Sequence, residues 1–186
     1  MQSTSESRSD YLSKLAGVFR RVGYHRASLH HLAEATGLQR SSLYYFFPGG
    51  KAQMVKEVIE ESNSIFYEVV LSVLETDESP QRRFETMIES LDKYYSSGRE
   101  SCILGLLTLE LPSDHFGSHI RDGFNRWIEA LRTVFLEYGL SKTESEARAI
   151  ESIAAIQGAL VLTRGTNNAE VFATILGRLS RQIFPE

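Results

Sequence analysis

Residues 28–51 read SLHHLAEATGLQRSSLYYFFPGGK, and this stretch decides how the first part of the chain folds. Ser28 is a good helix N-cap, and the apolar residues after it predict a short helix that ends before Gly37. Gly37 permits the positive φ of a tight turn, and a second helix over 40–46 ends at Pro48. Two short helices joined by a tight turn predict a helix-turn-helix, whose second helix enters the major groove of DNA.

The polar and aromatic side chains of this motif are the candidates for contact with DNA. Arg40 can form a bidentate contact with guanine or pair with a phosphate, and hydroxyl groups can donate to either. Lys51 and Ser28 each open a helix, where free backbone N–H groups bind phosphate. For each residue the alternative is a solvated surface side chain, and for Tyr45 it is packing. The predicted DNA-binding residues are Ser28, Gln39, Arg40, Ser41, Ser42, Tyr44, Tyr45 and Lys51.

The charge of the chain is unevenly distributed. The 186 residues carry a net charge of −4, but residues 1–56 hold eight Lys or Arg and three acidic residues. The remaining residues hold 12 Lys or Arg and 21 Asp or Glu. A basic segment joined to an acidic body is typical of a protein with a nucleic-acid-binding head.

Several other classes of protein do not fit the sequence. The single cysteine, Cys102, excludes an internal disulfide, and its thiol is either a small buried group or a redox sensor. The chain lacks an apolar run of about 20 residues and a signal peptide, so we expect a cytoplasmic protein without a membrane partner. His115 and His119 have no third ligand at a fixed spacing, and no acid–base or nucleophile set is present. We therefore expect no metal, no cofactor and no enzyme.

The spacing of apolar residues predicts an all-α chain of about nine helices and no strands. The fold class is an N-terminal three-helix head that contains the helix-turn-helix, followed by a helical body. In the helix over about 51–74, the expected buried stripe ends in Phe66, Val69, Val70 and Val73. The predicted helices cover about 7–22, a short segment after Ser28, 40–46, 51–74, 80–97, 103–111, 118–138, 141–164 and 168–184.

The residues of the motif resemble the TetR family of bacterial repressors. That pattern has Ser or Thr opening the second helix, an alanine, a glycine turn, Leu-Tyr in the third helix and a lysine opening the fourth. The matching positions are Ser28, Ala33, Gly37, Leu43, Tyr44, Phe47 and Lys51. The PGGK loop and the segment at Cys102 look like a subgroup that contains multidrug-type regulators. The resemblance implies a DNA-binding domain over 1–50 and an effector-binding and dimerisation domain over 51–186.

A row of small residues on the helix over 141–164 suggests where two subunits meet. Small side chains let a partner helix approach closely, and the resemblance implies a four-helix interface completed by the last helix. The alternative is that these positions form the core of one subunit. The predicted interface residues are Ala154, Ala155, Gly158, Ala159, Leu176 and Leu179.

The resemblance also implies a pocket in the body for an apolar or aromatic effector. Ordinary core packing is the alternative for each aromatic residue. The predicted pocket residues are Phe66, Tyr67, Tyr94, Glu110, Phe124, Trp127 and Gln157. The expected function is a homodimeric regulator, acting as a repressor, that binds a palindromic operator and is released by a small molecule. The alternative is an architectural DNA-binding protein without an effector.

Overall fold

The computed structural model of the chain describes residues 6–111, 113–182 and 184, without the side chains of residues 113–115 and 182. Within these residues every regular element is helical, which confirms the predicted all-α fold of nine α-helices. No helix in the described ranges has an apolar stretch long enough to cross a membrane. The helices are α1 (Arg8–Arg26), α2 (Leu29–Thr36), α3 (Arg40–Phe46), α4 (Gly50–Phe66), α5 (Pro80–Tyr94), α6 (Ile103–Glu110), α7 (Ser113–Tyr138), α8 (Lys142–Thr166) and α9 (Glu170–Gln182).

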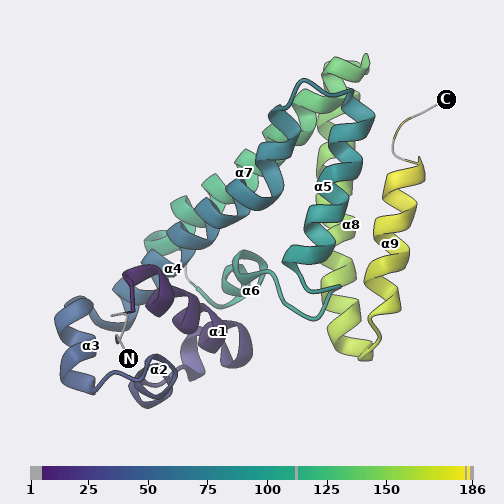
Figure 1. Cartoon of the computed structure of the whole chain (residues 1–186). Coiled ribbons are helices and arrows are strands. Elements are labelled where there is room, and N and C mark those ends of the chain that lie inside the picture. The colour runs from purple at the N-terminus through teal and green to yellow at the C-terminus, as the bar shows by residue number, and fades with distance from the viewer. Residues whose placement is uncertain (1–5, 112, 183, 185–186) are drawn as a thin grey trace, which may run out of the picture. The chain divides into compact units, whose positions relative to one another are not determined.

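The chain forms two compact units. The head unit comprises residues 1–64 and 103–120, so it contains α1, α2, α3, most of α4, α6 and the start of α7. The body unit comprises residues 65–102 and 121–186, with α5, α8, α9 and the rest of α7 (Figure 1).

Local capping sets the helix boundaries of the head unit. Ser7 begins α1 in a reciprocal capping box with Asp10, and Ser28 begins α2 by accepting a hydrogen bond from the His31 N–H. Gly37 ends α2 in the left-handed region at φ 71°, as the sequence predicts. Gly23, at φ 78°, interrupts α1 rather than ending it. One further helical turn therefore follows the predicted stop and leads to Ser28.

A π-helical turn changes the buried face of the segment after α4. Residues Tyr67–Leu71 form this turn, and Ser72–Glu75 continue it as a 3-10 helix. Because a π-turn holds an extra residue, the side chains beyond it are displaced by about one position relative to an α-helix. Leu71 and Leu74 are buried, whereas Val69 is 45% exposed. The prediction that Val69 lies in the buried stripe is therefore wrong.

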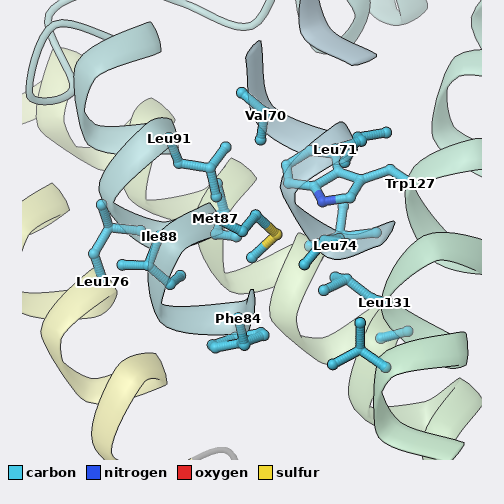
Figure 2. Packing of buried hydrophobic residues seen from close by; sticks show 14 of the residues in the cluster. Val70, Leu71, Leu74, Phe84, Met87, Ile88, Leu91, Trp127, Leu131 and Leu176 are labelled. Atoms are coloured by element: carbon cyan, nitrogen blue, oxygen red, sulfur yellow. The ribbon is translucent and has the colours of Figure 1, made fainter. Parts of the chain in front are cut away.

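The core of the body unit is a single cluster of apolar side chains. Residues of the 67–75 segment, α5, α7 and α9 interdigitate there (Figure 2). Trp127 of α7 lies beside Leu71, and Leu176 of α9 lies beside Ile88 of α5. Helix α7 begins at Ser113, five residues before the predicted start, because Gly117 does not interrupt it.

Candidate nucleic-acid interface

Helix α3 presents its polar and aromatic side chains to solvent. Leu43 is fully buried and fixes α3 to the head unit, while Arg40 and Ser41 are exposed and Ser42 is half-buried. Tyr44 is 48% exposed and Tyr45 is 83% exposed. So large an exposed area on Tyr45 favours the groove over packing as its role. Gln39 precedes the helix without a capping hydrogen bond from its side chain, so its amide is available.

An arginine that the sequence did not single out anchors the end of α3. Arg8 donates to the carbonyl oxygen of Phe46 at 3.1 Å and forms a bidentate pair with Glu57 of α4, with both bonds at 2.8 Å. Its guanidinium also lies 4.6 Å from the centre of the Phe47 ring. Burial acts to raise the pKa of Glu57, but the hydrogen bonds from Arg8 and Gln53 hold it below its ordinary value.

Lys51 occupies a different place from the one that the motif predicts. Its Nζ donates to the carbonyl oxygens of Tyr24 at 3.0 Å and Ala27 at 3.1 Å, and it lies 4.4 Å from the centre of the Tyr24 ring. The ammonium group is thus engaged inside the head unit, and the expected phosphate contact is not what this geometry supports. Ser28, by contrast, remains exposed at the start of α2, and its hydroxyl proton can still reach a phosphate.

Glu110 also departs from its predicted role. It belongs to the head unit, where its carboxylate accepts hydrogen bonds from the backbone N–H groups of Tyr24 and His25. The other six predicted pocket residues belong to the body unit. We therefore remove Glu110 from the pocket, because its carboxylate is already bound to the backbone.

The predicted interface residues divide into two groups. Ala154 and Gly158 are exposed, and a Cβ added at Gly158 meets no atom within 4 Å. Ala159 and Leu176 are 2% and 4% exposed and belong to the core of the body unit, which favours the alternative role of core packing within one subunit. Ala155 and Leu179 are half-buried. Four further exposed apolar residues on α8 lie near the Ala154–Gly158 edge: Ala147, Ile150, Val161 and Leu162.

The aromatic residues predicted for the pocket lie together in the body unit. The Phe66 ring centre is 5.3 Å from that of Tyr94 and 4.9 Å from that of Trp127, both edge to face. Phe124 packs against the same cluster. Among the predicted pocket residues, two buried donors, Trp127 Nε1 of this cluster and Gln157 Nε2 of α8, have no hydrogen-bond partner among the described residues.

A separate hollow of about 880 Å³ opens on the body unit between the 67–78 segment and α7. Of the predicted pocket residues it includes only Tyr67, whose hydroxyl donates to Glu75 at 2.8 Å. That hydrogen bond raises the pKa of Tyr67 above its ordinary value. The lining is strongly charged, with Arg83, Arg126 and several carboxylates, and is unlike the apolar pocket that the sequence suggests.

The groups considered for metal or redox chemistry have ordinary surroundings. The His119 ring lies 3.5 Å from Glu60, and the side chain of His115 lies outside the described residues. Among the side chains that are described, no three potential metal ligands gather. Cys102 is half-buried and packs against the body core.

Comparisons with known proteins cover both units. Residues 12–58 match the bacterial regulatory proteins of the tetR family, and residues 71–177 match the C-terminal domain of LmrA/YxaF-like transcriptional regulators. The Bacillus subtilis HTH-type transcriptional regulator LmrA is 24% identical over 171 residues, which cover 90% of this chain and 91% of LmrA.

Solved structures share the fold. A TetR transcriptional regulator from Legionella pneumophila has a TM-score of 0.86 and 20% identity over 98% of this chain and all of its own. The TetR family regulator CifR, solved as a cysteine mutant with 26-base-pair operator DNA, has a TM-score of 0.80 and 20% identity. The match covers 99% of this chain and 100% of CifR.

Proposed function

The chain belongs to the TetR family of bacterial transcriptional regulators, and on that premise we propose that it is a repressor whose homodimer binds a palindromic operator and leaves it when a small molecule binds. It is a DNA-binding regulator and not an enzyme. The observation that carries the finer proposal is α3, which exposes Arg40, Tyr44 and Tyr45 within the basic segment of residues 1–56. We propose that it acts in the cytoplasm, where a bacterial regulator meets its operator.

The reading of DNA begins at the N-terminus of α3. A recognition helix contacts base edges with its first residues, and here these are Gln39, Arg40 and Ser41. Ser28, at the start of α2, and the hydroxyls of Ser42 and Tyr44 supply phosphate contacts that set the register on the duplex. We assign this role to residues 1–50, and effector binding and dimerisation to residues 51–186.

A homodimer follows from how little one α3 can read. Its seven residues contact a few base pairs, and helix-turn-helix proteins reach specificity by placing two such helices about 34–36 Å apart on one face of the duplex. The exposed apolar edge of α8 gives the second subunit a surface, with Ile150, Ala154, Gly158 and Val161 three or four residues apart. A two-fold axis in the protein then requires a palindromic operator.

Release by an effector is a shift between two populations of the dimer. A ligand that binds the DNA-incompetent form more tightly draws the protein off the operator, and the size of the effect is limited by that difference in affinity. The unpartnered donor Trp127 Nε1 supports a site beside the Phe66–Tyr94 ring pair, because the Trp127 ring packs on Phe66, and we assign the second unpartnered donor, Gln157 Nε2, to the same site. A ligand suited to it has an aromatic or apolar body and a hydrogen-bond acceptor.

Arg40→Ala should weaken operator binding by about 1–3 kcal/mol and relax specificity at one base pair in each half-site, because a bidentate contact with guanine is lost. The measurement is fluorescence anisotropy on a panel of single-base operator variants. Arg99→Ala removes an exposed arginine from the body unit and serves as the control. If Arg40→Ala weakens every sequence equally, Arg40 binds phosphate and the base contact is excluded.

A compound that releases the protein from its operator should change the emission of Trp127, which is the only tryptophan in the sequence. Gln157→Leu should weaken that compound by about 1 kcal/mol, since one hydrogen bond is lost, while Gln81→Leu on the surface of α5 should have no effect. Titration followed by fluorescence measures both. If a releasing compound leaves the Trp127 emission unchanged, the effector site is not beside Trp127, and the hollow at Tyr67 becomes the candidate. Finding no releasing compound favours the architectural protein.

A further inference from the structure

Residues 23–27 form a single helical turn, here called the linker turn, between the break at Gly23 and the N-cap of α2. Because Ser28 follows at once, the position of this turn fixes where α2 begins. A turn bounded by a break and a cap has unsatisfied N–H groups at its start and unsatisfied C=O groups at its end. Both sets are met by charged side chains from other helices.

Glu110, at the end of α6, binds the first half of the linker turn. Its carboxylate accepts from the N–H groups of Tyr24 and His25, and its carbonyl oxygen lies 2.8 Å from His25 Nε2. A Cβ placed on Gly23 would overlap this carboxylate, so glycine is needed both for its φ of 78° and for the approach of Glu110. A carboxylate at this end complements the partial positive charge of a helix start.

Lys51 of α4 binds the second half. Its ammonium group donates to the carbonyl oxygens of Tyr24 and Ala27, and it lies over the Tyr24 ring. The negative charge of Glu110 therefore meets the N–H end of the turn and the positive charge of Lys51 meets its C=O end. The ring of Tyr24 also lies 6.2 Å from that of Phe116, at the start of α7.

We propose that Glu110 is the positioning residue through which α6 holds α2 and α3 in the DNA-reading orientation, with Lys51 as its counterpart from α4. The inference rests on the proposed function, since it concerns how the helix-turn-helix is presented to an operator. Specific binding needs a fixed α3, whereas non-specific binding depends on the exposed cationic side chains of residues 1–56. A shift of α6 that withdraws the Glu110 carboxylate should therefore lower the affinity for the operator and leave the affinity for non-specific DNA unchanged.

The test compares Glu110→Ala, Glu110→Gln and the wild-type dimer on two DNA duplexes. One carries the sequence that the wild type selects from random DNA, and the other is a scrambled duplex of equal length. Glu110→Ala should bind the selected sequence at least about tenfold more weakly and the scrambled duplex unchanged. Glu110→Gln should fall between, because its amide oxygen still accepts a hydrogen bond. Glu89→Ala, which removes an exposed carboxylate of α5, should match the wild type.

Hydrogen exchange at the amides of Tyr24 and His25 gives a readout that needs no DNA. Exchange there should become faster in Glu110→Ala while the core of the body unit stays protected. Equal losses on both duplexes indicate general unfolding of the head unit and overturn the proposal, as does unchanged exchange at the two amides. If the wild type selects no sequence at all, the proposed function fails, and exchange alone then decides whether Glu110 holds the turn.

A double-mutant cycle separates the loss of the Gly23–Glu110 contact from the backbone strain that any side chain at position 23 causes. Gly23→Ala adds a Cβ that collides with Glu110 and also strains the backbone, but the strain is the same in either background. Gly23→Ala should therefore reduce binding to the selected sequence more in the wild type than in Glu110→Ala. Additive effects in the cycle would show that Gly23 and Glu110 act independently and would overturn the coupling.

Discussion

Gly158→Leu should convert the dimer to monomers and lower operator affinity by at least about 10³-fold, towards non-specific binding. Gly158 is exposed on α8, and a Cβ added there meets no atom within 4 Å, so each subunit can accommodate leucine without repacking. In the proposed dimer the same side chain holds the two α8 helices apart, because small residues are what allow close approach. No DNA-contacting residue changes, and the loss comes from the half-site spacing alone.

Analytical ultracentrifugation at micromolar protein decides the oligomeric state, and anisotropy on the operator gives the affinity. Gln81→Leu, which places the same side chain on the exposed face of α5, is the control and should remain a dimer. A wild type that sediments at 21.0 kDa refutes the dimer itself. A Gly158→Leu protein that remains a tight-binding dimer shows instead that this edge of α8 faces solvent in the assembly.

The parts of the fold that depend on neighbouring residues are readable from the sequence. Ser28, Ser79 and Ser141 each accept a hydrogen bond from the N–H three residues on, so the starts of α2, α5 and α8 follow from local chemistry. Gly37 likewise ends α2. Exceptions are the continuation of α1 past Gly23, the start of α7 before Gly117 and the π-turn at Tyr67–Leu71, whose extra residue no periodic pattern predicts.

The functional sites depend on contacts between distant residues, and here sequence reasoning reaches less far. Lys51 is correctly placed at a helix start, but the carbonyl groups that bind it belong to Tyr24 and Ala27, and no spacing rule connects them. Glu110 lies 86 residues from Tyr24. The sequence around such a polar residue is therefore compatible with several hydrogen-bond partners, and the fold determines which of them it contacts.

The small residues of α8 do not show from the sequence alone which face of the helix is exposed. Small and apolar residues occur around most of this helix, so composition alone does not separate the face that packs in the subunit from the exposed one. The fold places Ala159 in the core and Gly158 on the surface, although they are adjacent. The packing of the body unit therefore determines which edge of α8 is left for a partner helix.

Operator affinity should fall about 10³-fold between 50 and 200 mM salt, as expected for a dimer that neutralises about six phosphates. The eight cationic residues of 1–56 are not equally available for this. Arg8 is engaged by Glu57, Lys14 by Glu6, Lys56 by Glu60 and Lys51 by backbone carbonyls, and Arg20 is half-buried. Arg21, Arg26 and Arg40 are exposed, which gives about three cations in each subunit.

The salt dependence of DNA affinity in two methionine variants shows which of these cations contact phosphate. Arg26 lies two residues before Ser28, so it is next to the α2 N-terminus that we propose binds phosphate. Arg26→Met should reduce the slope of log affinity against log salt by about one for each subunit. Lys51→Met should leave the slope unchanged, because its ammonium is bound to carbonyl oxygens, and should instead lower thermal stability. A reduced slope in Lys51→Met would return Lys51 to the phosphate contact predicted from the motif, and a flat salt dependence of the wild type would exclude a charge-driven DNA interface.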